Sequence, residues 1–464
     1  MTLKPWLATY RDNGIPETVN ADAWPSVVHL LEDAMRRYAD KPAFRAFGQT
    51  LSFADVDRQS AAFAAWLQQR LGVKKGDRVA VMLPNLLAFP IVCIGILRAG
   101  AVQVNVNPLY TPRELEHQLK DSGAETIVIL ENFAITLQDV LKNTPVKNVI
   151  TTQIGDMLGF PKSLIVNMVV KHVKKMVPSW AIHNTVKFND TLTQGSRLKL
   201  NPVQIGHEDI AFLQYTGGTT GVSKGAMLTN RNIVANMMQA HAWLKPMVRE
   251  GQEIIITALP LYHIFSLTAN CMVFTELGGL NILITNPRDI PAFVKELQKY
   301  PVTCMTGVNT LFNALINNPD FAKIDFSTWK LALGGGMAVQ RAVAEKWKQV
   351  TTVPLIEAYG LTETSPAACI NPMDLKEYNG AIGLPVPSTE CSVRDEAGNE
   401  VPMGEPGELW VRGPQVMKGY WQRPDESAKV LKGDGWLATG DMAIVTPDGF
   451  FKLVDRKKDM ILVS

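Results

Sequence analysis

The first part of the chain alternates short apolar runs with longer stretches of helical periodicity. Arg78 to Leu83 is an apolar run that Pro84 ends, and it predicts a strand. A helix is expected over about Leu87 to Arg98, followed by a second strand over Ala101 to Val106. The chain returns to a strand over Thr126 to Leu130. This alternation of strand and helix indicates a parallel sheet covered by helices.

A helix start between the last two of these strands can be read from single residues. Thr111 can serve as the N-cap, Pro112 suits the first helical position, and Glu114 completes a capping box. The chain leaves this helix by Gly123. These residues predict a helix that begins at Pro112 and precedes the strand expected after Gly123.

The pattern changes beyond residue 371. Strand–helix alternation resumes after Asp209 and runs to about Pro366, but glycine and proline are frequent from there on. Short strands such as Glu408 to Arg412 and Phe450 to Val454 predict a small antiparallel β-barrel subdomain packed on the α/β body. We therefore expect an α/β body of two subdomains over residues 1–370 and a β-rich subdomain over residues 371–454.

An insertion in the α/β body, Met157 to Trp180, is both apolar and basic. Drawn as a helix, much of its apolar set shares one side, and the lysines crowd towards one end. Such a helix can lie among lipid headgroups, or it can pack on its own protein, as surface helices more often do. The pattern leaves both interpretations open. The residues in question are Leu164, Ile165, Met168, Val169, Val173, Met176 and Val177, with Lys171, Lys174 and Lys175.

Composition and charge exclude several classes of protein. With 464 residues, 46% of them hydrophobic and 19% charged, the chain is expected to be a soluble globular protein of two or three structural units. Lysine and arginine number 46 against 44 acidic residues, a near balance that argues against a nucleic-acid partner. The five cysteines form no CxxC motif, which argues against a zinc site and favours the cytoplasm. No apolar run reaches the roughly 18 residues of a membrane span, so any membrane contact is expected to be peripheral.

The strongest candidate for chemistry is a segment rich in glycine, threonine and serine, directly after a strand expected at Ile210 to Leu213. Glycines let backbone N–H groups approach a polyphosphate, hydroxyls add donors, and Lys224 adds a positive charge. It is not a Walker A loop, because Gly225 follows the lysine where serine or threonine would stand. A plain loop is the alternative interpretation. The candidate phosphate-binding residues are Tyr215, Thr216, Gly217, Gly218, Thr219, Thr220, Gly221 and Lys224.

This segment resembles the phosphate-binding loop of the acyl-adenylate-forming superfamily of AMP-binding enzymes. A second segment, Glu357 to Pro366 (EAYGLTETSP), matches the same superfamily. The resemblance implies that Tyr359 stacks on adenine, that Thr362 bonds the α-phosphate, and that Glu363 holds Mg²⁺ together with Thr216. A flat ring for the base and a carboxylate for the metal suit an ATP site. The resemblance of this second segment extends the expected nucleotide contacts to Glu357, Ala358, Tyr359, Gly360 and Thr362.

A third segment, Asp434 to Lys458, resembles the signature region of fatty acyl-CoA synthetases. By this resemblance Asp441 accepts hydrogen bonds from the ribose hydroxyls, Arg456 contacts the ribose and phosphate side, and Lys458 is the hinge. Ala438 stands where the family leads us to expect histidine, so one contact there is in doubt.

Two weaker matches complete the expected site. Gly334, Gly335 and Gly336 follow a strand-like run and resemble the adenine-side loop of the superfamily. His263 falls where the superfamily has an aromatic residue or histidine beside the acyl carboxylate, although a lone histidine is as often structural. No aspartate stands near it to pair with an amino group, which disfavours an amino-acid substrate. Residues that could line an acyl tunnel, or could equally be core, are Met237, Met238 and Trp243.

The resemblance implies a long-chain fatty-acid–CoA ligase. With Mg²⁺, a fatty acid and ATP would give acyl-AMP and pyrophosphate, and coenzyme A would then give acyl-CoA and AMP. Catalytic roles are expected for Lys224, Thr362, Glu363 and His263. Residues 455–464 would be the hinge and the start of the smaller mobile domain with which family members continue, so we expect this chain to bind ATP but to turn over poorly. A medium-chain or aryl-CoA ligase and a non-catalytic nucleotide- or lipid-binding module stay as alternatives, and contact with the inner membrane surface and a homodimer stay open.

Overall fold

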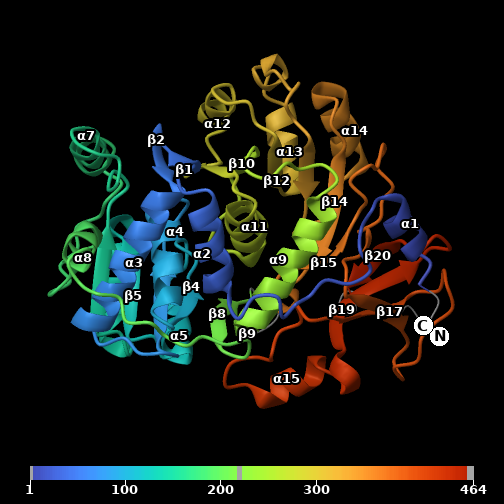
Figure 1. Cartoon of the computed structure of the whole chain (residues 1–464), viewed down its shortest axis with the longest axis horizontal. Helices are drawn as coiled ribbons and strands as arrows, with labels where there is room; N and C mark the ends of the chain where they lie inside the picture. Colours follow the sequence, from blue (N-terminus) through green and yellow to red (C-terminus); the bar gives the residue numbers. More distant parts are fainter. Residues whose placement is uncertain (1–3, 217–221, 457–464) are drawn as a thin grey trace.

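The computed structural model describes residues 4–216 and 222–456, and three sheets organise them (Figure 1). The first is seven-stranded, in the order β7-β6-β5-β3-β4-β8-β9, and only its β8–β9 pair is antiparallel. Its strands are β3 (Arg78–Met82), β4 (Val102–Asn105), β5 (Thr126–Leu130), β6 (Asn148–Thr152), β7 (Val186–Lys187), β8 (Ile210–Tyr215) and β9 (Gly225–Thr229). The helices along the same stretch are α3 (Phe53–Arg70), α4 (Ala88–Arg98), α5 (Pro112–Ser122), α6 (Ala134–Val140) and α8 (Phe188–Gly195).

The expected start of α5 is confirmed in detail. The Glu114 amide donates to Thr111 Oγ1 at 3.4 Å, and the Thr111 amide donates to Glu114 Oε2 at 2.8 Å. Gly123 closes the helix in the left-handed region, with φ of 64°. The local residues are sufficient here because each of these bonds joins positions three apart.

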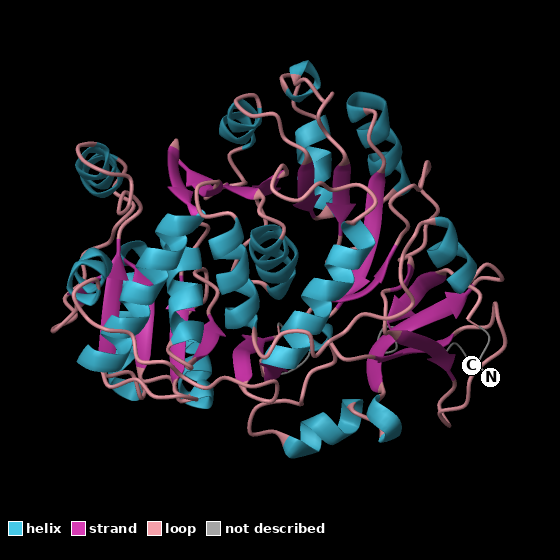
Figure 2. Cartoon of the chain, viewed as in Figure 1, coloured by secondary structure: helices cyan, strands magenta, loops and turns pink. Residues whose placement is uncertain are grey.

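The second sheet has nine strands, in the order β16-β15-β14-β13-β12-β10-β11-β1-β2, and β10 to β14 run parallel. The strands are β1 (Pro42–Ala46), β2 (Gln49–Ser52), β10 (Ile254–Thr257), β11 (Leu280–Leu283), β12 (Cys304–Gly307), β13 (Leu331–Gly334), β14 (Leu355–Gly360), β15 (Ala367–Ile370) and β16 (Leu384–Pro385). The accompanying helices are α2 (Val27–Arg37), α9 (Asn230–Leu244), α10 (Ile264–Ser266), α11 (Val273–Glu276), α12 (Ile290–Leu297), α13 (Asn309–Ile316) and α14 (Arg341–Thr351). Helices α2, α9 and α11 lie between the two large sheets (Figure 2).

The third sheet is the expected antiparallel β unit. It has four strands, in the order β17-β18-β19-β20, and lies at the end of the molecule that also carries the N-terminal helix α1 (Figure 1). The elements are β17 (Glu390–Arg394), β18 (Gly407–Arg412), β19 (Leu437–Val445), β20 (Phe451–Arg456), α1 (Leu7–Asp12) and α15 (Pro424–Val430). Strand β20 begins within one residue of the start expected from the sequence.

The insertion forms a shorter helix than its 24-residue pattern suggested. Helix α7 (Lys162–Met168) runs into one π-helical turn, Val169–Val173, and the element stands apart from the rest of the molecule in Figure 1. Of the large apolar side chains in residues 157–180, Leu158 and Val170 are buried, but six are exposed rather than packed on the protein. The exposed ones are Phe160, Leu164, Ile165, Met168, Val173 and Met176. No helix among the described residues is both long enough and apolar enough to cross a membrane.

Candidate active site

The expected phosphate loop is the turn of the β8–β9 hairpin. Tyr215 and Gly225 pair in register, and the Thr216 amide donates to the Lys224 carbonyl at 3.0 Å. The Ser223 hydroxyl donates to the Thr216 carbonyl at 2.6 Å. The ends of the loop are therefore fixed to each other. The residues at its tip, Gly217, Gly218, Thr219, Thr220 and Gly221, lie outside the described residues.

Tyr215 anchors the start of the loop. Its hydroxyl donates to Asp121 Oδ2 at 2.8 Å, and burial, with Asp121 beside it, raises the pKa of the phenol. Arg423 pairs with the other oxygen of that carboxylate at 2.5 Å. A Cβ on Gly225 would meet the Tyr215 ring at 3.0 Å, so the ring packs directly on the glycine backbone. The environment of Tyr215 is that of a structural anchor for the loop.

Lys224 and Glu363 converge on one residue that the motifs did not indicate, Tyr420. The Tyr420 hydroxyl donates to Glu363 Oε1 at 2.6 Å, and Lys224 Nζ lies 4.6 Å from the centroid of the Tyr420 ring. Lys224 Nζ also pairs with Glu426 Oε2 at 2.9 Å. The structure thus brings the loop lysine and the expected metal-binding carboxylate to one place. Among the described residues, no cluster of three His, Cys, Asp or Glu side chains has the arrangement of a preformed metal site.

Tyr359 and Asp441, expected to bind adenine and ribose, are in direct contact. The Tyr359 hydroxyl donates to Asp441 Oδ2 at 2.6 Å, and both residues are buried. Burial is the main cause of the raised pKa of the Tyr359 phenol, and Asp441 adds to it. Arg456 lies opposite Asp441 in the β19–β20 register, which places it at the same point of the third sheet. Lys458 lies outside the described residues.

Glu357 supports the glycine loop instead of facing solvent. Its carboxylate accepts a hydrogen bond from the Val339 amide at 3.1 Å, and burial raises its pKa to about 7. Gly335 follows β13 where space is scarce: an added Cβ would meet the Phe265 ring at 3.0 Å and the Ala358 carbonyl at 3.2 Å. These contacts explain why glycine stands at position 335. Gly335 and Gly336, with Ala358 to Thr362, line one cavity.

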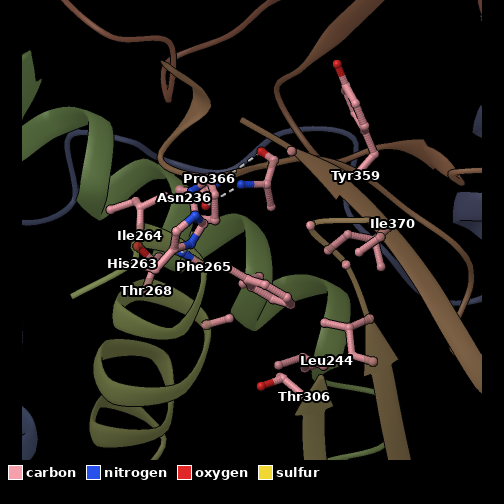
Figure 3. A pocket seen from close by; sticks show the side chains of 18 of the residues that line it. Asn236, Leu244, His263, Ile264, Phe265, Thr268, Thr306, Tyr359, Pro366 and Ile370 are labelled. Carbon is pink, nitrogen blue, oxygen red and sulfur yellow. Dashed lines mark hydrogen bonds between the residues drawn. The ribbon is translucent and has the colours of Figure 1, made fainter. Parts of the chain in front are cut away.

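That cavity is lined mainly by apolar side chains (Figure 3). Its lining residues include members of the glycine loop after β13, residues 358–362 and members of helix α9. Among the residues that the structure describes, no lysine, arginine, aspartate or glutamate lines the cavity. In Figure 3 the Tyr359 side chain points away from Leu244 and Thr306, which lie at the other end. Apolar residues at that end and along the walls are Ala240, Leu244, Ile255, Phe265, Phe274, Met305, Leu331, Leu333, Ile370 and Met373.

Helix α9 contributes to the cavity through a face other than the one suggested by its bulky residues. Asn236, Ala240 and Leu244 line the cavity at successive four-residue intervals. Met237 and Trp243 are buried in the core, and the Trp243 indole donates to the Asn371 carbonyl at 3.1 Å. Met238 packs partly buried against the same core. These three residues therefore belong to the core and do not line an acyl tunnel.

His263 lies at the mouth of the cavity, close to Asn236 and Thr268 (Figure 3). Solvent reaches the imidazole, yet surrounding protein desolvates it and lowers its pKa. Its Nδ1 accepts a hydrogen bond from the Phe265 amide at 3.3 Å and caps α10. The ring therefore has a structural role and also faces the space that a substrate would enter.

Three comparisons bear on what this site does. A sequence profile described as AMP-binding enzyme matches residues 31–421. A long-chain-fatty-acid–CoA ligase of Yersinia pestis is 57% identical over 461 residues, which cover 99% of this chain and 82% of the relative. A protein of the same name from Salmonella typhimurium is 56% identical with the same coverage. The crystal structure of an anthranilate CoA ligase in complex with anthranoyl-AMP superposes with a TM-score of 0.84 at 23% identity, covering 96% of this chain and 81% of that one.

Proposed function

The chain belongs to the AMP-binding enzyme family, and from that premise we propose that it is an AMP-forming acid–thiol ligase that joins long-chain fatty acids to coenzyme A. The observation that carries the proposal is the 57% identity to a long-chain-fatty-acid–CoA ligase along 99% of the chain. The apolar cavity supports an acyl substrate, because the described residues that line it include no charged group that could bind a polar group at the far end of the substrate.

In the proposed first step, a carboxylate oxygen of the fatty acid attacks the α-phosphorus of ATP. The bond to the bridging oxygen breaks, acyl-AMP forms, and pyrophosphate leaves. This reaction depends on positioning and on neutralising charge, so it requires no strong base. Lys224 would neutralise the leaving pyrophosphate, and Thr362, which lines the cavity, would bond the α-phosphate where the acyl group enters.

Mg²⁺ fits the oxygen donors present. Glu363 offers a carboxylate and Thr216 a hydroxyl, and this ion usually takes one or two protein ligands while phosphates and water complete its shell. When bound, it would neutralise phosphate charge. The role of the protein is to hold Glu363 in place, which the 2.6 Å bond from Tyr420 does.

In the proposed second step, the coenzyme A thiolate attacks the acyl carbonyl carbon, and AMP leaves with the electrons of the broken C–O bond. His263, uncharged because its pKa is lowered, lies at the cavity mouth and would contact the acyl carbonyl without adding a counter-charge. Tyr359 and Asp441 would hold adenine and ribose through both steps.

A series of carboxylates tests the substrate class. The 464-residue chain is incubated with Mg·ATP and hexanoate, laurate, palmitate, oleate or benzoate, and acyl-AMP is quantified after acid quench. We expect the C12 to C18 acids to exceed hexanoate and benzoate. Equal or better use of benzoate would instead indicate an aryl-CoA ligase, and no acyl-AMP with any acid would indicate a binding module.

We also propose that the exposed face of residues 160–176 contacts an anionic membrane. It carries Leu164, Ile165 and Met168 on α7, each more than half exposed. From residue 157 to 189 the sequence contains lysines but no aspartate or glutamate. Apolar side chains flanked by lysines suit the boundary between acyl chains and anionic headgroups. The face would place the enzyme at a source of its fatty-acid substrate.

A further inference from the structure

The segment 417–427 runs alongside the strand that follows Lys224. The Met227 amide donates to the Gly419 carbonyl at 2.8 Å, the Trp421 amide donates to the Gly225 carbonyl at 2.7 Å, and Ala226 and Tyr420 form a β-bridge. These backbone bonds fix the segment to the phosphate loop. Its side chains therefore keep a set position relative to Lys224.

The segment forms two ion pairs near the loop: Arg423 pairs with Asp121 of α5, and Glu426 pairs with the loop lysine, Lys224. Asp121, which also accepts a hydrogen bond from Tyr215, has a side chain only 6% exposed, although its partner Arg423 is 41% exposed. Lys224 and Glu426 are 29% and 33% exposed. Breaking the first pair would leave the buried Asp121 carboxylate without its cation, which is costly, whereas a pair between two partly solvated groups contributes little and exchanges partners readily. The first pair is suited to anchor the loop, and the second is suited to open.

Glu426 also retains a partner when Lys224 leaves. Lys429, one turn further along α15, pairs with Glu426 Oε1. Hydrogen bonds from Lys429 and Lys224 hold the pKa of Glu426 at about 2, so its carboxylate is charged throughout the neutral range. Loss of Lys224 would thus leave Glu426 paired and partly solvated.

Tyr420 separates Lys224 from Glu363. Its ring faces the ammonium group at 4.6 Å, and its hydroxyl bonds the carboxylate at 2.6 Å. Because Glu426 pairs with Lys224 at 2.9 Å, the ammonium is neutralised without consuming the charge of Glu363. A cation and a carboxylate that must each bind part of Mg·ATP are so prevented from neutralising each other.

We propose that Glu426 is a positioning residue that serves as the internal counter-ion of Lys224. Incoming polyphosphate must displace Glu426 from the lysine before it can bind there. The inference rests on the proposed function, because it takes Lys224 as the group that binds pyrophosphate. Glu426 weakens polyphosphate binding by occupying the ammonium group, and it helps pyrophosphate to leave by reclaiming that group. Removing its charge should therefore tighten binding.

The test uses isothermal titration of the 464-residue chain with Mg²⁺–pyrophosphate and, separately, Mg·ATP. We expect Glu426→Gln to bind pyrophosphate roughly two- to fivefold more tightly than the unmodified chain, the range of an exposed ion pair. Asp425→Asn makes the same charge change on the neighbouring residue and should leave the affinity unchanged. In a Lys224→Ala background, Glu426→Gln should have no effect, because the partner is absent.

The possible results separate the two claims. Equal affinities of the Glu426→Gln variant and the unmodified chain, or weaker binding by that variant, would overturn the counter-ion role while leaving the proposed function intact. Tighter binding by both Asp425→Asn and Glu426→Gln would also overturn it, because the effect would then come from net charge. An unmodified chain that binds neither ligand would refute the proposed function and this inference with it.

Discussion

The Tyr359 hydroxyl donates a hydrogen bond to Asp441 Oδ2 at 2.6 Å and so connects β14 of the nine-stranded sheet to β19 of the four-stranded sheet. The two residues are 82 positions apart in the sequence. Because both are buried, the bond contributes to stability as well as to the arrangement of the expected adenine and ribose contacts.

Replacing Tyr359 with phenylalanine should separate these roles. The ring is kept, but Asp441 loses a donor inside the protein, so we expect the free energy of unfolding to fall by about 1–3 kcal/mol. Denaturant unfolding followed by tryptophan fluorescence measures it. Tyr300→Phe removes a hydroxyl that bonds the partly exposed Glu296 and should change stability by less than about 0.5 kcal/mol. A similar loss in both variants would contradict a special role for the Tyr359 bond.

Lys224→Ala should weaken pyrophosphate binding about tenfold or more, the loss of a charged hydrogen-bond donor to phosphate. Lys418→Ala is a matched control, because Lys418 is an exposed lysine of the neighbouring segment 417–427 and pairs with Glu208. Titration calorimetry gives both affinities. If the two variants bind equally well, the loop lysine does not contact the polyphosphate.

Glu357 predicts a pH dependence of stability with a defined sign. Its pKa rises on folding from 4.5 to about 7, so the folded state binds the proton more tightly. The associated stability is fully present below about pH 4.5 and is lost as pH rises through about 7. Glu357→Gln mimics the protonated form, and relative to the unmodified chain it should gain roughly 3 kcal/mol between pH 4.5 and pH 8. Thermal or denaturant unfolding at the two pH values measures the gain, and a constant difference would contradict the burial of an ionisable carboxylate.

The local elements could be predicted from sequence because their determinants are neighbours. Thr111 and Glu114 lie three residues apart, and the β5 range matches the apolar run that predicted it. Helix α9 shows the limit of this approach. It is buried on most sides, so no polar stripe distinguishes the face of Asn236, Ala240 and Leu244, which lines the cavity, from the face packed in the core.

The partners of the motif residues could not be predicted, because they come from distant parts of the chain. Glu426 lies 202 residues from Lys224, and Tyr420 lies 57 residues from Glu363. Neither belongs to a glycine-rich or otherwise distinctive run. The sequence suggests only that some acidic residue neutralises the loop lysine, and it does not identify that acidic residue.

The face of residues 160–176 predicts binding to vesicles that contain anionic lipid. Cosedimentation with phosphatidylglycerol vesicles should exceed that with phosphatidylcholine and should decrease with salt. Replacing Leu164 and Ile165 with glutamine should reduce binding about tenfold, because both side chains lose apolar contact with lipid. Met403, also exposed but on the β-rich unit, provides the control variant Met403→Gln. Equal binding by the two variants would contradict this assignment of the membrane face.

The central claim is that a fatty acid attacks the α-phosphorus of ATP at the site formed by Lys224, Thr362 and Glu363. Palmitate labelled with oxygen-18 in both carboxylate oxygens tests it directly. After reaction with Mg·ATP, acyl-AMP is cleaved with hydroxylamine and the AMP is analysed by mass spectrometry. Attack at the α-phosphorus predicts AMP that carries an oxygen-18 atom from the acid, whereas ADP as the nucleotide product, or AMP without the label, would contradict the account.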